Sequence, residues 1–300
     1  MKMIEFKELT KKFSNEFTAL DKINLTIEKG TAFGLLGSNG AGKSTMLRLI
    51  AGIYRQEAGE LLIDGEKVYD NVKIKEKIFF INDETIQFGH HTLKSLKDFY
   101  KGFYPNFSEE LFDSLREKIG LPFDKKLNQF SKGMKRQAIV IVGLACQTDY
   151  LMLDEAFDGL DPAMRIIVKR MLVDAMIDRE LTVIISSHNL KEISEICDTV
   201  AFVHHGQILF AKSIDSVKNE IHKIQVAYKE APEENAFEGL DIVKAETTQS
   251  VRHYIVRGDH DQIKKVFEAT NPIIFELIPL TLEEIFIIEM EGKGYGYENI

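Results

Sequence analysis

The sequence is poor in long apolar runs, in cysteine and in positive charge, and each shortage excludes a class of protein. Its best apolar stretch, residues 138–146, is about half as long as the roughly 20 residues that a membrane-spanning helix needs, so we expect no such helix. The two cysteines, Cys146 and Cys197, fit a reducing compartment. A net charge of −9 argues against a dedicated nucleic-acid binder, because phosphate backbones are held mainly by clustered Lys and Arg.

The first residues also lack the marks of a secretion signal. The segment MKMIEFKELTKKF alternates polar and apolar residues as a strand does, and it has no continuous apolar core before a small-residue cleavage site. The remaining composition, 44% hydrophobic and 28% charged residues in a chain of 300, is typical of a soluble globular protein with one large or two modest domains.

The hydrophobic pattern predicts an α/β fold. The first segment has strands joined by turns, with Asp64-Gly65 at a hairpin turn, and a buried strand, AFGLL, that ends in a glycine-rich loop. Helical periodicity follows from about Leu93 to Cys146, in what we expect to be a helical subdomain at about residues 84–145. Two later apolar runs, YLMLD and TVIIS, are typical of central parallel strands. We therefore expect an antiparallel β subdomain, a mostly parallel core sheet and an inserted helical subdomain within residues 1–220. A small α+β domain is expected at residues 221–300, with a loose tail.

Two helices are marked clearly at their ends. Ser108 can cap a helix that Gly120 ends, and Thr281 can form a capping box with Glu284 at the start of another. The second of these predicted helices lies near the end of the small α+β domain.

A phosphate-binding loop is predicted between the buried strand and the helix that follows it. The stretch GSNGAGKS, residues 37–44, has glycines that let backbone N–H groups turn inward and form an anion site at a helix N-terminus. Lys43 can reach the terminal phosphates of a nucleotide, and the Ser44 hydroxyl can bind Mg²⁺. A merely flexible loop would explain the glycines but not the ordered Gly42-Lys43-Ser44.

Two later strands end in polar groups. Asp154 ends an apolar strand, where it can hold Mg²⁺ through water, and Glu155 follows it, where a carboxylate can orient or deprotonate an attacking water. An Asp-Glu pair after a strand is also a common signal of a helix start, but the phosphate loop favours the chemical interpretation. His188 ends a third strand on the same side of the sheet, where a neutral imidazole could hydrogen-bond a γ-phosphate, although a lone histidine is more often structural.

The motifs GSNGAGKST, FSKGMKRQ, LMLDEAFDGLDP and IISSH, in this order, resemble those of the ATP-binding subunit of an ABC transporter over residues 1–215. The resemblance implies a P-loop ATPase that uses ATP and Mg²⁺ and powers a separate membrane-spanning permease. It assigns Glu155, His188 and Lys43 to catalysis, and Ser44, Asp154 and Asp83 to the metal. It assigns to the nucleotide Phe13, Gly37, Ser38, Asn39, Gly40, Ala41, Gly42, Lys43, Ser44, Thr45, Ser131, Gly133 and Asp161.

The same resemblance implies an active site shared between two chains. In this family a short signature, here residues 130–134, contacts the γ-phosphate of an ATP held by a second subunit, so that two chains pair head to tail. Ser131 offers a hydroxyl and Gly133 a close backbone N–H at a helix N-terminus, which an anion would complement. Asp161 resembles the residue that positions the partner's phosphate loop. Phe13 matches the aromatic that stacks on adenine, and Phe17 is its rival.

The sequence departs from the family pattern at several places. The family's strand before the helical block ends in a glutamine that touches Mg²⁺ and the attacking water, and here Asp83, or by a one-residue slip Glu84, takes its place. A carboxylate binds Mg²⁺ but cannot donate a hydrogen bond, so Asp83 is predicted to be a functional substitute. Ser38 stands where proline is common, Lys132 replaces the first signature glycine, and residues 156–157 replace Pro-Thr. None of these changes removes a catalytic group, so we expect a homodimer with two equal sites.

The variants FSKGM and LDEAFDGLDP, and the ending PLTLEEIFI, resemble bacterial exporters of peptides, toxins and antimicrobial compounds. The expected location is peripheral, on the cytoplasmic face of the cell membrane, where a permease holds the chain. The rival function is that of a soluble ATPase of the same superfamily in DNA repair or translation. It is disfavoured because the sequence has neither a long coiled-coil insertion nor a second cassette, and no nucleic-acid partner is expected. A second rival gives the C-terminal domain a regulatory rather than a structural role.

Overall fold

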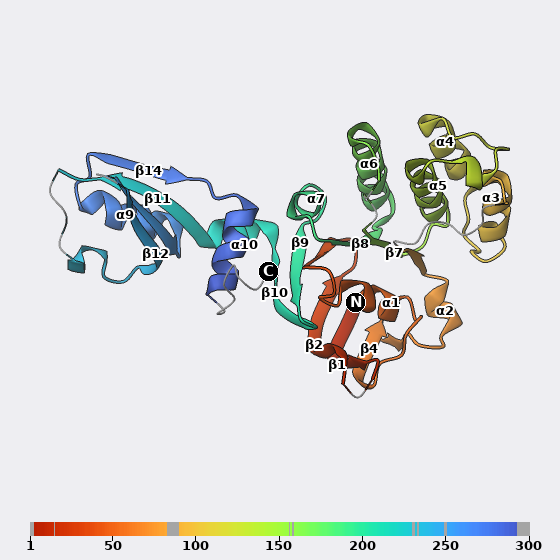
Figure 1. Cartoon of the computed structure of the whole chain (residues 1–300), viewed down its shortest axis with the longest axis horizontal. Coiled ribbons are helices and arrows are strands. Elements are labelled where there is room, and N and C mark those ends of the chain that lie inside the picture. Colours follow the sequence, from red (N-terminus) through yellow and green to blue (C-terminus); the bar gives the residue numbers. More distant parts are fainter. Residues whose placement is uncertain are drawn as a thin grey trace. The chain divides into compact units, whose positions relative to one another are not determined.

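The computed structural model describes residues 3–292 except residues 15, 83–89, 156, 158, 230–231, 233 and 249–250. The chain divides into two compact units, Met1–Ala211 and Lys212–Ile300 (Figure 1). The division lies just before helix α8 (Ile214–Glu220) rather than after it. The reason is packing, because Val217 of this helix belongs to a buried cluster with Ile285 and Ile288 of the second unit.

Two sheets form the framework of the first unit. The smaller has the strand order β2-β1-β4-β5 and is antiparallel, and the larger has the order β10-β9-β3-β8-β7-β6, in which β3, β6, β7, β8 and β9 pair in parallel. The predicted antiparallel subdomain and mostly parallel core sheet are therefore confirmed. The strands are β1 (Met3–Lys12), β2 (Thr18–Glu28), β3 (Ala32–Leu36), β4 (Ala58–Ile63), β5 (Glu66–Lys67), β6 (Ile78–Ile81), β7 (Tyr150–Asp154), β8 (Thr182–Ser187), β9 (Thr199–His204) and β10 (Gln207–Ser213).

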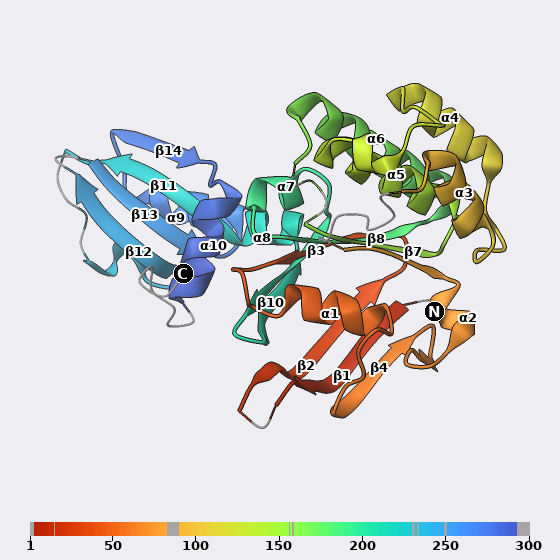
Figure 2. The same ribbon diagram turned by 45° about the vertical axis from the view of Figure 1, so that its right-hand side comes forward.

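Helix α1 (Lys43–Ile50) lies between the two sheets (Figure 2). Strand β3 is buried on both of its faces, which explains its continuous apolar sequence. Phe33 and Leu35 belong to the same buried cluster as Leu47 of α1. Gly34 faces the other way, where a Cβ would lie only 2.4 Å from a methyl of Ile193. The phosphate loop that joins β3 to α1 is thus held at both ends by packed elements.

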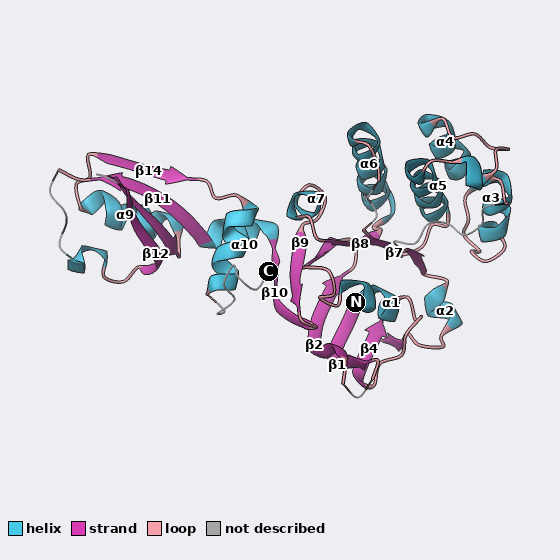
Figure 3. Cartoon of the chain, in the orientation of Figure 1, coloured by secondary structure: helices cyan, strands magenta, loops and turns pink. Residues whose placement is uncertain are grey.

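Helices cover the opposite face of the larger sheet (Figure 3). Helix α5 packs closely on β6, because a Cβ at Gly143 would lie 2.7 Å from the Phe79 ring. Ser108 caps α4 and Gly120 ends it in the left-handed conformation at φ 77°, as the sequence predicts. None of the described helices combines the length and the apolarity that a bilayer crossing demands. The remaining elements of the unit are α2 (Val72–Lys75), α3 (Leu93–Lys101), α4 (Glu109–Ile119), η1 (Leu127–Gln129), α5 (Lys132–Ala145), α6 (Pro162–Arg179) and α7 (Leu190–Ser194).

The second unit is a four-stranded antiparallel sheet with helices, as its sequence predicts. The strand order is β12-β13-β11-β14, and a cluster that includes Val226, Tyr254 and Phe267 packs α9 against the sheet. Helix α10 begins with the predicted capping box between Thr281 and Glu284. The elements are β11 (Ile221–Ala227), η2 (Glu234–Phe237), β12 (Asp241–Thr248), β13 (Val251–Arg257), α9 (His260–Ala269), β14 (Ile274–Ile278) and α10 (Leu282–Glu291).

Candidate active site

The phosphate loop depends on glycine at both of its ends. A Cβ at Gly37 would lie 2.2 Å from the carbonyl oxygen of Val203, and one at Gly42 would lie 2.8 Å from a methyl of Leu20. Gly42 also has φ 115°, a conformation that residues with a side chain rarely adopt. Helix α1 has neither a side-chain cap nor an acidic residue in its first turn. Its free backbone N–H groups therefore form an anion site.

Lys43 folds back over this loop. Its buried ammonium donates hydrogen bonds to the carbonyl oxygens of Gly37 at 2.6 Å and Ser38 at 3.1 Å, and its Nζ lies 3.8 Å from Oε1 of Glu155. Burial lowers the pKa of the Lys43 ammonium, although the charges of Glu155 and Asp154 oppose the shift. An anion bound at the loop would favour the protonated form of Lys43 and so complete this arrangement.

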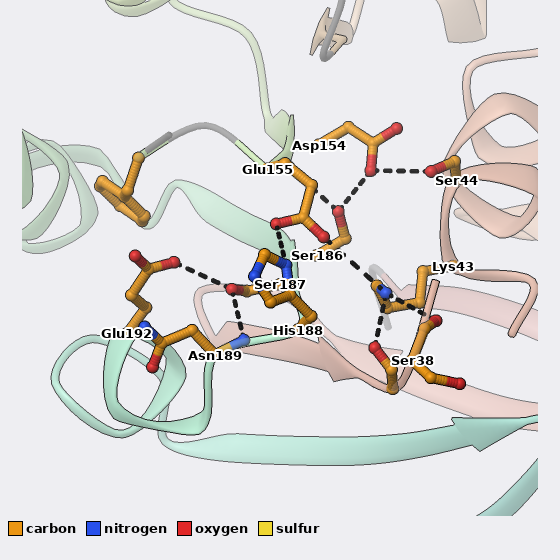
Figure 4. A network of polar contacts seen from close by, with 12 residues as sticks. Ser38, Lys43, Ser44, Asp154, Glu155, Ser186, Ser187, His188, Asn189 and Glu192 are labelled. Atoms are coloured by element: carbon orange, nitrogen blue, oxygen red, sulfur yellow. Dashed lines mark hydrogen bonds and ion pairs between the residues drawn. The ribbon is translucent and has the colours of Figure 1, made fainter. Parts of the chain in front are cut away.

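Ser44 and Asp154 meet from two elements. Ser44 Oγ donates to Oδ1 of Asp154 at 3.0 Å, and the hydroxyl of Ser186 donates to the same oxygen (Figure 4). Asp154 is fully buried, and its Oδ2 has no hydrogen-bond partner among the residues that the structure describes. A buried carboxylate oxygen without a partner, next to a hydroxyl, fits a Mg²⁺ ion, which prefers oxygen ligands and keeps several waters. Asp83, the third predicted ligand, lies outside the described residues.

Glu155 and His188 form the next contact in the cleft. Oε2 of Glu155 lies 3.1 Å from Nδ1 of His188, whose side chain is 52% exposed, whereas that of Glu155 is 17% exposed. The backbone N–H of Glu155 donates to the carbonyl and the hydroxyl oxygens of Ser186 at 3.2 Å. Glu155 has φ 47°, and such left-handed backbone at a strand end is common where a side chain is aimed into a functional site.

Of these residues, Lys43, Ser44, Glu155 and His188 line one cleft of about 510 Å³. Phe17 lines the cleft, whereas Phe13 stacks on Phe17 at 6.2 Å between ring centroids and meets the edge of Tyr54. Of the two candidate aromatics, the rival Phe17 is therefore the one that lines the cleft. The lining residues are Phe17, Ala19, Asn39, Gly40, Ala41, Gly42, Lys43, Ser44, Thr45, Lys132, Arg136, Glu155 and His188.

The signature residues lie mostly outside the chain's own cleft. Ser131 is exposed and caps α5 by accepting a hydrogen bond from the N–H of Met134 at 3.1 Å. Asp161 caps α6 in the same way, with the N–H of Met164 at 3.0 Å. A Cβ at Gly133 would lie 3.1 Å from the carbonyl oxygen of Gly159, so the signature packs against the segment that leads to Asp161.

Two basic side chains of the cleft are absent from the predicted site residues: Arg136, and Lys132, for which the sequence left open whether its cation lies near a phosphate or faces solvent. The stem of Lys132 lies against Gly159, where a Cβ would be 3.0 Å from Cδ of the lysine. The buried guanidinium of Arg136 donates to the carbonyl oxygens of Asn82 at 2.6 Å and Glu155 at 3.4 Å. The only signal in the sequence was the density of basic residues in KGMKRQ, which is equally typical of a solvated helix turn.

The comparison with known proteins agrees with this geometry. The family described as "ABC transporter" matches residues 20–158. The "ABC transporter ATP-binding protein YtrB" of Bacillus subtilis (strain 168) is 30% identical over 97% of this chain and 99% of its own length. The chain belongs to the ABC transporter ATP-binding proteins.

A further relative and a solved structure are similar over most of this chain. The "Bacitracin transport ATP-binding protein BcrA" of Bacillus licheniformis is 26% identical over 98% of this chain and 99% of its own length. A solved "ATP binding subunit of ABC transporter" shares the fold with a TM-score of 0.66 at 22% identity, over 72% of this chain and 92% of that chain.

The family assignment confirms the predicted activity. As an ABC transporter ATP-binding subunit, the protein binds and hydrolyses ATP and works with a transmembrane permease. The rival role in DNA repair gains no support from these relatives.

Proposed function

We propose that the ABC subunit hydrolyses ATP in the cleft described above, with Glu155 as the general base. The observation that carries the proposal is the position of its carboxylate, 3.1 Å from Nδ1 of His188 and 3.8 Å from Nζ of Lys43. A carboxylate near the γ-phosphate can take a proton from the attacking water. His188 holds that carboxylate in place, and Lys43 neutralises charge on the terminal phosphates.

Ser44 and Asp154 are the residues that would hold Mg²⁺, through the serine hydroxyl and the unpaired Oδ2. When bound there, the ion would neutralise negative charge on the phosphates of the nucleotide. The described residues contain no cluster of three or more His, Cys, Asp or Glu side chains suited to a metal. The remaining ligands would therefore be phosphate and water oxygens, with Asp83 as a further candidate.

Two copies of the chain would complete each other's sites in a head-to-tail homodimer. Ser131 is exposed at the N-terminus of α5, and Asp161 is exposed at the N-terminus of α6. Among the described residues that line the chain's own cleft, Lys132 is the only member of the signature. Ser131 and Gly133 are thus available to the γ-phosphate of a second chain.

The first unit also offers an apolar groove to the permease. The groove, of about 420 Å³, lies between α2 and α3, and its lining includes Val72, Phe99 and Phe103, which are 70%, 46% and 64% exposed. Exposed aromatic residues of this kind mark binding surfaces for an apolar helix. The permease would hold the subunit at the cytoplasmic face of the membrane.

Export of peptides or antimicrobial compounds is the transport function that the relatives favour. Their printed names include bacitracin transport for BcrA and, for SrtF of Streptococcus pyogenes, lantibiotic transport at 28% identity over 76% of this chain. Within the chain, we assign the ATP-binding domain, expected at residues 1–220, to the first unit, which ends at Ala211, with its helical subdomain at about 84–145. The accessory domain, expected at residues 221–300, corresponds to the second unit and includes α8.

The test is Glu155→Gln, measured by phosphate release and by size-exclusion chromatography with ATP. We expect ATP to bind while hydrolysis falls by about a hundredfold or more, because the amide cannot accept the proton of water. The variant should then accumulate as a dimer with ATP. Glu117→Gln, on a side chain that is 71% exposed, is the matched control and should behave as the wild type. Hydrolysis by Glu155→Gln at the wild-type rate would refute the assignment.

A further inference from the structure

An ion pair between a partly exposed arginine and a buried glutamate lies next to the proposed catalytic residues without belonging to them. Nη1 of Arg165 lies 2.9 Å from Oε1 of Glu192, whose side chain is 7% exposed. Arg165 belongs to the first turn of α6, whereas Glu192 belongs to α7, after the next strand. The pair therefore joins the segment that follows Glu155 to the segment that follows His188.

Glu192 fixes both chain neighbours of His188. Its Oε2 accepts a hydrogen bond from the hydroxyl of Ser187 at 2.9 Å, and that hydroxyl accepts one from the backbone N–H of Asn189 at 3.0 Å. Figure 4 shows this chain of contacts beside the contact between His188 and Glu155. The imidazole is half exposed, so its position depends on its backbone more than on packing.

Arg165 holds the other segment. Its Nη2 lies 3.5 Å from the carbonyl oxygen of Phe157, two positions after Glu155. Its backbone N–H donates to the carbonyl oxygen of Asp161 at 2.9 Å, in the turn that Asp161 caps. A single side chain thus touches both the loop that leaves the catalytic glutamate and the carboxylate that fixes the histidine loop.

Stability alone does not account for this pair. A buried ion pair gains little over an apolar pair of similar volume, because both charges must leave water. The pair instead fixes the relative orientation of its partners, because the planar guanidinium and the carboxylate each contact two groups in a fixed geometry. Removing one charge would leave the other without compensation in a largely buried place.

We propose that Arg165 and Glu192 are positioning residues that hold the backbone on either side of His188 and the backbone at Phe157 and Asp161 in one arrangement. The inference rests on the roles given above to His188 and Asp161. Loss of the γ-phosphate at His188 would displace its loop, and the pair would pass that displacement to the segment that faces the second subunit. Neither side chain lines the nucleotide cleft, so both would act through other residues.

The test is a double-mutant cycle in the full chain, with Glu192→Gln and His188→Ala made singly and together. We expect Glu192→Gln to lower kcat about tenfold or more and to leave the KM for ATP within about twofold. In the His188→Ala background, Glu192→Gln should lower kcat little further, because the imidazole that Glu192 positions is already absent. Arg170→Gln, an exposed charge change on the same helix, is the control and should match the wild type.

A second variant covers the case in which Glu192→Gln does not fold. Ser187→Ala removes the hydrogen bond to Glu192 without leaving a buried charge unpaired, and it should reproduce part of the loss in kcat. The inference would be overturned if Glu192→Gln lowered kcat by the same factor with and without His188, because this would mean that the variant destabilises the protein in general. Wild-type turnover by Ser187→Ala and Glu192→Gln would overturn it as well. If His188→Ala itself turned over normally, the proposed role of His188 would fail instead.

Discussion

Arg136 lines the nucleotide cleft and joins two strand ends through its guanidinium. It donates to the carbonyl oxygens of Asn82, just after β6, and of Glu155, just after β7. Replacing Arg136 by glutamine would remove its hydrogen bonds to the carbonyl oxygens of Glu155 and Asn82. We expect Arg136→Gln to lower kcat about tenfold and the free energy of unfolding by about 1.5–3 kcal/mol, measured by phosphate release and urea denaturation.

Lys135→Gln is the control for Arg136→Gln, because it makes the same charge change one position earlier on α5, on a side chain that is only half-buried. It should retain turnover and stability close to those of the wild type. Equal losses in both variants would mean that the charge of α5, and not the contact of Arg136 with the strand ends, is what matters.

Among single residues, the sequence predicts those that belong to a short motif, because the motif can be recognised without knowing the tertiary contacts. Lys43, Ser44, Asp154 and Glu155 stand in motifs next to a strand end, so their convergence follows from a parallel sheet. Arg136 and Phe17 could not be assigned in this way. The partners of Arg136 lie 54 and 19 positions away, and the choice between Phe13 and Phe17 depends on which ring the turn after β1 leaves beside the loop.

Helix α10 owes its start to a reciprocal pair of hydrogen bonds. Oγ1 of Thr281 accepts from the N–H of Glu284 at 3.2 Å, and Oε2 of Glu284 accepts from the N–H of Thr281 at 2.9 Å. Thr281→Ala should reduce the free energy of unfolding of the second unit by about 1 kcal/mol, measured by urea denaturation followed by circular dichroism. Thr281→Ser keeps the hydroxyl and should restore most of that loss. An alanine variant as stable as the wild type would show that packing alone places the helix.

Element types and ends were predictable because capping and periodicity are local. The caps at Ser108 and Thr281 and the left-handed Gly120 are each found where the sequence places them. Strand order was not predictable in the same way. Strand β3 lies between β8 and β9 in the larger sheet. This order depends on contacts between strands that are far apart in the sequence, and no local pattern of residues predicts them.

For the whole molecule, the step that matters is how ATP hydrolysis reaches the permease. The proposed surface is the groove between α2 and α3, where Phe103 and Val72 are 64% and 70% exposed. A single exposed apolar side chain is ordinary, but Phe99, Phe103 and Val72 are exposed together in one groove, and such a cluster is typical of a binding surface. Helix α3 packs against α5, whose first turn holds the signature, so one packed block would connect the proposed permease surface to the proposed site for the second subunit's ATP.

Phe103→Asp tests this coupling because it places a charge in the groove without touching the cleft. We expect the purified variant to hydrolyse ATP like the wild type, and to lose at least tenfold in co-purification with the permease from membranes. Ile177→Asp is the control, since Ile177 is 76% exposed on α6 and lies outside the groove. Equal loss of permease in both variants would show that any surface charge disturbs assembly. Normal retention by Phe103→Asp would move the permease surface elsewhere on the subunit and leave the assignments in the cleft untouched.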